Sequence, residues 1–149
     1  IEYPKNGFFL LKKIIKKISS LTGTLLIIDY GYSKTNNLNT LQSVIKHKKN
    51  FILENLGKAD ITSHVNFPLL NEFLLKNNLK TKKTISQAVF LQNMGIKQRA
   101  ENISKKMNFK DQANLYLRLK RLLSPNSMGN LFKVKLAYKF KSNNFLGFN

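Results

Sequence analysis

Apolar residues and lysine pairs alternate along residues 8–20, FFLLKKIIKKISS. The apolar positions recur at helical spacing and share one face, while the lysines share the other. This pattern predicts an amphipathic helix whose apolar face covers a sheet; a helix lying on a membrane surface is the alternative. Gly23 is expected to end the helix, because glycine readily adopts the left-handed conformation of a helix C-cap.

A continuous apolar run, TLLIID, follows directly at residues 24–29. A run of strand length without alternation predicts a strand that is buried on both faces, as in a parallel sheet flanked by helices. Helix, short turn and buried strand together form the second half of a βαβ unit.

The middle of the chain gives weaker signals. Residues 33–39 are expected to form a loop and residues 41–65 are too mixed for a prediction, whereas residues 67–77 predict a helix with Asn66 as its N-cap. Further along, the pattern predicts a strand at 79–86, helices at 87–94, 97–107 and 110–123, and a strand at 132–139. The last strand alternates strictly, so we expect it to lie at or near a sheet edge, or at least to have a solvated face. The fold class is α/β, with strands for about half of a doubly wound sheet.

Composition narrows the possible function. The chain has 149 residues, 42% of them hydrophobic, which is enough for one globular domain. It has no cysteine, and this excludes disulfides and a thiol nucleophile. No apolar run approaches the roughly 20 residues that cross a bilayer, so no membrane span is expected.

The net charge of +19 invites a nucleic-acid interpretation. We do not favour it, because the lysines are scattered over every segment and specific base readout relies on arginine. The chain has only Arg99, Arg118 and Arg121.

Asp29 ends the most hydrophobic run and is followed by Tyr30 and Gly31. In open α/β sheets, ligands bind beyond the carboxyl ends of the strands, so these residues are candidates for a site. A carboxylate there accepts hydrogen bonds from a cation, a tyrosine offers a hydroxyl and a ring, and a glycine lets the backbone approach a ligand. The alternative is that Asp29 only caps a turn.

A second polar cluster precedes the helix predicted at 67–77. Asp60, Thr62, Ser63 and His64 lie within a few residues of one another, where they could hold a ligand or satisfy a helix cap. His64 is a candidate general base near neutral pH, although a surface role is the simpler interpretation. No nucleophile elbow, P-loop, GxGxxG motif or metal-ligand spacing occurs.

Five blocks give the chain a family resemblance. In order, these are LLIIDYGY, TLQSVIKHKK, GKADITSHVNF, FLQNMGI and SPNSMGNLFKVKLA, and their order and spacing extend the resemblance over roughly residues 1–139. Together they resemble the C-terminal half of the MidA-type methyltransferases, a family that includes the mitochondrial protein arginine methyltransferase used in complex I assembly.

The resemblance implies part of a Rossmann-like class I methyltransferase sheet that uses S-adenosylmethionine (SAM). Residues 24–29 would be its fifth strand, 79–86 its sixth and 132–139 its antiparallel seventh, with a helical insertion at 87–123. The glycine-rich SAM loop and the acidic ribose-binding residue of such enzymes lie in earlier strands. We therefore expect the whole chain, residues 1–149, to be the C-terminal half of a methyltransferase domain, without its SAM-binding half and inactive alone.

The resemblance also extends to single residues. Asp29, Tyr30 and Gly31 match the family's DYG, and Asp60 and Thr62 match an ADLT-x-x-V-D-F block in which Asn66 replaces an aspartate. Glu2 aligns with a family glutamate, although Tyr-Pro follows it here instead of Ser-Pro. By this resemblance Asp29, Tyr30, Asp60 and Glu2 would be catalytic, and Gly31, Thr62 and His64 would bind substrate. Met94–Gly95 and Met128–Gly129 would be structural turns.

The function implied is transfer of a methyl group from SAM to a protein arginine, with a respiratory complex I subunit as one expected substrate. A homodimer is expected as well, in the bacterial cytoplasm or in the mitochondrial matrix of a eukaryote. The alternatives are a basic module that binds RNA or an acidic protein partner, and a fragment without activity.

Overall fold

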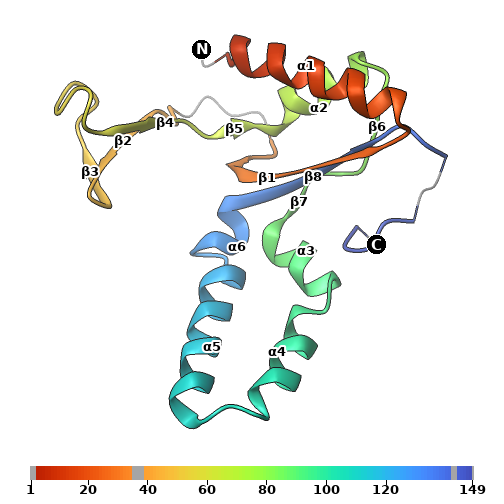
Figure 1. The fold of residues 1–149 in the computed structure, drawn as a ribbon. Coiled ribbons are helices and arrows are strands. Elements are labelled where there is room, and N and C mark those ends of the chain that lie inside the picture. Colours follow the sequence, from red (N-terminus) through yellow and green to blue (C-terminus); the bar gives the residue numbers. More distant parts are fainter. Residues whose placement is uncertain (1–2, 35–38, 142–143, 149) are drawn as a thin grey trace.

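The computed structural model describes residues 3–34, 39–141 and 144–148. Its main sheet has helices α1 and α2 on one face and a helical arm on the other (Figure 1). Helix α1 (Lys5–Ser20) buries Phe8 and Ile15 against the sheet and leaves its lysines outside, as the sequence predicts.

The end of α1 differs from the prediction. Gly23 does not adopt the left-handed conformation; Thr22 does, with a φ of 50°. The amide of Gly23 instead donates a hydrogen bond to the carbonyl of Ile18 at 2.9 Å. The chain turns one residue earlier than the glycine signal indicates.

The main sheet is built around the last strand. Strand β1 (Thr24–Tyr32) pairs antiparallel with β8 (Phe132–Tyr138) from Thr24–Tyr138 to Tyr30–Phe132. The strand order is β5-β1-β8-β6, and β7 also pairs with β8. The prediction of an antiparallel last strand in an α/β sheet is therefore confirmed.

The predicted solvated face of β8 is wrong, although the strand does lie next to the edge of the sheet. Strand β8 lies between β1 on one side and β6 and β7 on the other, and residues 134–138 are all buried. Lys135, expected on a solvated face, is only 3% exposed. Its long aliphatic stem lies inside, while its Nζ donates to the carbonyl of Lys82 at 2.7 Å, so a lysine fits a buried position here.

The predicted burial of β1 on both faces is also wrong for the described chain. Leu25 and Ile27 pack against the core beneath α1 and α2, but Leu26 and Ile28 are each 45% exposed. The parallel partner β5 (Val65–Asn66) meets β1 only at Gly31 and Tyr32. Among the described residues, no strand lies beside residues 24–30 on that side.

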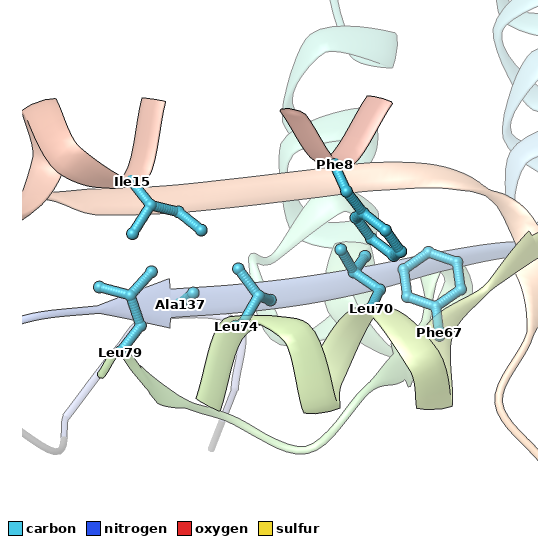
Figure 2. Close-up of a cluster of buried hydrophobic side chains, with 7 residues drawn as sticks. All are labelled: Phe8, Ile15, Phe67, Leu70, Leu74, Leu79 and Ala137. Atoms are coloured by element: carbon cyan, nitrogen blue, oxygen red, sulfur yellow. The ribbon is translucent and has the colours of Figure 1, made fainter. Parts of the chain in front are cut away.

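Helix α2 (Phe67–Lys76) supplies the centre of the core. Asn66 caps it as predicted, since its Oδ1 accepts a hydrogen bond from the amide of Leu69 at 3.0 Å. Phe67 and Leu74 are fully buried between α1 and the sheet (Figure 2). The ring of Phe73 stacks on that of Phe8 at 4.3 Å, so α1 and α2 close over the sheet together.

Residues 39–63 include an element that the sequence did not predict. They contain a separate antiparallel sheet in the order β3-β2-β4, made of β2 (Gln42–Ile45), β3 (Lys48–Asn50) and β4 (Asp60–Thr62). Lys46 and His47 turn β2 into β3 with φ values of 49° and 63°. Such turns normally carry glycine or asparagine, so the hairpin gave no sequence signal.

The strand predicted at 79–86 is two short strands, β6 (Lys80–Thr81) and β7 (Ile85–Ser86), and both pair with β8. The three predicted helices are present as α3 (Gln87–Asn93), α4 (Ile96–Ser104) and α5 (Phe109–Leu123). A short α6 (Met128–Leu131) returns the chain to β8.

The two Met-Gly pairs lie at bends of the arm. Gly95 separates α3 from α4 with a φ of 77°. Gly129 is buried so closely that an added Cβ would lie 2.3 Å from the carbonyl oxygen of Leu123.

Candidate functional site

The candidate site begins at the carboxyl end of β1. Asp29 is half-buried there, and one of its carboxylate oxygens accepts a hydrogen bond from the amide of Tyr30 at 2.8 Å. Strand alternation places Asp29 on the same face as Ile27, toward α1 and α2. The carboxylate therefore stands at the end of the core and not on the open face of β1.

A cavity of about 670 Å³ opens at this position. Its lining is mainly apolar and comes from α1, β1 and the start of α2. Asp29, Ser63, His64 and Asn66 add polar groups to this wall. The tertiary structure thus brings Asp29 and His64, 35 positions apart in the sequence, to one cavity.

Tyr30 joins these residues through its ring. The ring contacts that of His64 at 5.7 Å and that of Phe132 at 5.8 Å, both edge to face. The amide of His64 donates to the Thr40 hydroxyl at 3.0 Å, which fixes the backbone between β4 and β5. Tyr30 therefore supports His64 from outside the cavity lining.

The packing around Gly31 explains why a glycine is needed at this position. An added Cβ would lie 2.3 Å from the carbonyl oxygen of Val65 and 2.8 Å from the ring of Phe67. The close approach that requires glycine is thus that of β5 and α2. A role for Gly31 in substrate binding stays a prediction.

The other predicted residues lie elsewhere. Asp60 is exposed in β4, paired with Val44, and Thr62 pairs with Gln42 in the same small sheet, which extends away from the main sheet (Figure 1). Neither lines the cavity that holds Asp29. Glu2 lies outside the described residues.

Two lysines that the sequence analysis did not single out lie next to the site. Lys133 is the cross-strand partner of Asp29, and Lys135 is the partner of Ile27, so both share the face of Asp29. Burial lowers the pKa of Lys133, whose Nζ donates to the carbonyl of Asn130, and lowers the pKa of Lys135 to about 8. The alternating pattern of β8 concealed them, because it is typical of lysines on a solvated face.

These residues suit a guanidinium group better than they suit the nucleoside part of SAM. A carboxylate and an imidazole in an apolar cavity can accept hydrogen bonds from a guanidinium group. The chain has no glycine-rich turn between a strand and a helix for a nucleotide cofactor. Across the described residues, no group of three or more His, Asp or Glu side chains could hold a metal ion, and no helix is both long and apolar enough to span a bilayer.

Comparison with known proteins identifies relatives. Residues 1–85 match a family model described as "Putative S-adenosyl-L-methionine-dependent methyltransferase". A Xenopus laevis protein named protein arginine methyltransferase NDUFAF7, mitochondrial, is 29% identical over 136 residues, which are 89% of this chain and 30% of that protein. The Danio rerio protein of the same name is 29% identical over 124 residues, 83% of this chain and 29% of that protein.

Two solved structures are similar to this chain in fold. A COG1565 superfamily protein from Burkholderia thailandensis has a TM-score of 0.74 and 23% identity, over 93% of this chain and 37% of that one. A second, bound to S-adenosyl-homocysteine, has a TM-score of 0.63 and 25% identity, over 91% of this chain and 36% of that one. The chain therefore spans about a third of the length of these relatives.

The family model covers more than half of the chain. The chain belongs to this family of S-adenosyl-L-methionine-dependent methyltransferases.

Proposed function

We propose that the chain forms the substrate side of a SAM-dependent protein arginine methyltransferase. The observation that carries the proposal is the carboxylate of Asp29, held at the carboxyl end of β1 in an apolar cavity with His64. The relatives named protein arginine methyltransferase support a protein arginine as substrate.

Asp29 is the residue proposed to act on the substrate. Its carboxylate would accept hydrogen bonds from the guanidinium group, orient the nitrogen that receives the methyl group and accept the proton that leaves. His64, in the same cavity, is proposed to bind the substrate, with Tyr30 holding the imidazole in place. Roles for Asp60, Thr62 and Glu2 remain predictions from the resemblance.

The resemblance also extends the proposal to substrate and location. A respiratory complex I subunit is the proposed protein substrate, and the enzyme is proposed to be a homodimer. Relatives named as mitochondrial support the matrix as the location in a eukaryotic host. For a bacterial host, the cytoplasm is the proposed location.

The first experiment measures SAM binding by isothermal titration calorimetry. It compares this chain with a version extended upstream to the full open reading frame. Binding only by the extended protein is expected, because the chain lacks a glycine-rich turn for the cofactor. Absence of binding by both proteins would remove the methyltransferase proposal.

The second experiment tests Asp29 in the extended protein. Asp29→Asn is expected to lower kcat by about 100-fold or more, since the amide cannot accept the proton, while the Kd for SAM stays the same. Asp60→Asn is the matched control, because Asp60 lies outside the cavity and its substitution should change kcat much less. Equal turnover of the Asp29→Asn variant and the unsubstituted enzyme would refute the role of Asp29.

A further inference from the structure

The C-terminal segment, residues 144–148, contacts the helical arm. The arm consists of helices α3 to α6; it follows β7 and leads back into β8. Ser86 of β7 pairs with Lys133 of β8, so both connections of the arm lie at the same end of β8. The segment at the C-terminus lies beside α3 (Figure 1). The arm is thus held at its root by the two connections and further along by the C-terminal segment.

Gly147 and Phe148 attach the segment to α3. The ring of Phe148 contacts that of Phe90 at 5.5 Å, and the side-chain amide of Asn93 donates to the carbonyl of Gly147 at 3.1 Å. Gly147 is buried and has a φ of 85°. A Cβ added to Gly147 would lie 2.4 Å from the ring of Phe90. Only glycine fits between the segment and the helix at this position.

Phe145 attaches the same segment to the far end of β8. Its ring contacts that of Tyr138 at 4.6 Å and that of Phe140 at 5.6 Å, and the Nζ of Lys82 lies 5.8 Å from its centre. Tyr138 is buried at the last position of β8, about 20 Å from Phe132 at the rise of a strand. The segment therefore joins α3 to the end of β8 that is far from the connections of the arm.

The arm is closely packed within itself. Gln87 is buried, and its Nε2 donates to the carbonyl of Leu122 in α5 at 3.1 Å. Gly129 of α6 lies so close to Leu123 that a Cβ would not fit. Movement of the arm is therefore expected at its two connections and not inside it. A contact far from a pivot resists rotation more strongly than one beside it, and the C-terminal segment makes such a contact.

The root of the arm adjoins the candidate site. Helix α6 ends at Leu131, and the ring of the next residue, Phe132, contacts that of Tyr30 at 5.8 Å. The ring of Tyr30 in turn contacts that of His64. A change in the angle of the arm would therefore move a ring that supports the site.

We propose that residues 144–148 form a strap that fixes the angle between the arm and the main sheet. Gly147 and Phe148 hold α3, Phe145 holds the end of β8, and release of the strap lets the arm turn about its two connections. This inference goes beyond the proposed function, because the strap requires neither SAM nor a substrate and its test measures no activity.

Double electron–electron resonance with the full-length protein tests the proposal. Nitroxides are attached to ketone-bearing unnatural residues that replace Lys76 on α2 and Lys105 at the end of α4, both of which are exposed. The protein with an intact strap should give one narrow distance distribution. Phe145→Ala/Phe148→Ala should broaden it, because the arm then samples other angles. Hydrogen exchange of the α3 amides should also rise about tenfold through loss of the ring contacts.

Two further variants separate the strap from general effects. Leu146→Ala is the matched control, since Leu146 lies in the same segment but is 77% exposed, and it should leave both measurements unchanged. Gly147→Ala keeps both rings but pushes the segment away from Phe90, so it should act in the same direction as the double variant. If the double variant lost its circular dichroism spectrum, Gly147→Ala would decide by itself.

A distance distribution that stays narrow in the substituted protein would overturn the proposal, even if the α3 amides exchanged faster, because the contacts would then be local packing alone. Equal broadening by Leu146→Ala would overturn it as well. Failure of the full-length protein to bind SAM would remove the proposed function and leave the result for the strap unaffected.

Discussion

At the scale of single residues, Lys135 is a buried cation in the centre of the main sheet. It is 3% exposed, and burial lowers its pKa from 10.5 to about 8. Between pH 8 and 10.5 the unfolded chain therefore binds a proton that the folded chain does not, and the free energy of unfolding should rise with pH through this range. The cost of burying the charge is fully present below about pH 8 and absent above about pH 10.5.

Replacing this lysine should therefore stabilise the protein. Lys135→Met is expected to raise the free energy of unfolding at pH 7 by about 1 kcal/mol, allowing for the lost bond to Lys82, and to flatten its rise between pH 8 and 10.5. Urea unfolding across this pH range measures both effects. Lys139→Met is the matched control, because Lys139 also donates to a carbonyl, that of Asn78 at 2.9 Å, but is exposed. A pH profile that Lys135→Met leaves unchanged would contradict the burial argument.

Gly31 is the second residue whose environment allows a direct test. Gly31→Ala should lower the free energy of unfolding by about 2–3 kcal/mol, because the new methyl group meets the backbone of Val65 and the ring of Phe67. Denaturant titration measures the loss. Gly7→Ala is the control, since a Cβ in α1 would lie 3.5 Å from that of Pro4, an ordinary contact, and alanine favours the helix by up to about 1 kcal/mol. If both variants proved equally stable, the close packing of β5 on Gly31 would be wrong.

At the scale of elements, the start of α2 sets the position of the site, because Asn66 lines the cavity and caps the helix that forms the core. Asn66→Ala should cost about 1 kcal/mol through loss of the bond to the amide of Leu69. Asn66→Asp restores the residue type of the family motif, keeps the cap and adds a favourable charge at the helix N-terminus. Thermal unfolding should rank aspartate at or above asparagine and alanine lowest; equal melting temperatures for all three would argue against the cap.

At the scale of the whole molecule, the edge of β1 that faces away from β8 is the part of the described chain that most favours aggregation. No described strand pairs with residues 24–30 there, and Leu26 and Ile28 are each 45% exposed on one face. An unpaired edge with apolar side chains promotes pairing with another chain. The 149-residue chain by itself should therefore self-associate as its concentration rises.

Sedimentation velocity tests this expectation. Leu26→Lys/Ile28→Lys should shift the chain toward the monomer, because charge on an edge strand opposes pairing. Val89→Lys is the control, since Val89 is 43% exposed but lies on helix α3. If the chain stayed monomeric without substitution, the expectation that the unpaired edge of β1 drives self-association would be wrong.

The sequence by itself determined the elements that have a local signal. The lysine pairs of α1, the asparagine cap of α2 and the bend at Gly95 are each fixed by contacts within a few residues, and the structure confirms them. Asp29 was found for a similar reason, because a carboxylate at the end of an apolar run is visible in the sequence. The family, too, followed from ordered blocks of residues.

Only the tertiary structure decided what depends on distant contacts. The sequence of β8 predicts a strand with a solvated face, yet β6 and β7, from more than 40 positions earlier in the chain, pair with it, and Lys135 is buried with its Nζ bonded to the carbonyl of Lys82 between them. The hairpin of β2 and β3 turns on Lys46 and His47, which carry no turn signal. Tertiary packing also brought His64 to Asp29 and left Asp60 in the small sheet, because the path between strands, and not the spacing along the chain, determines which side chains meet.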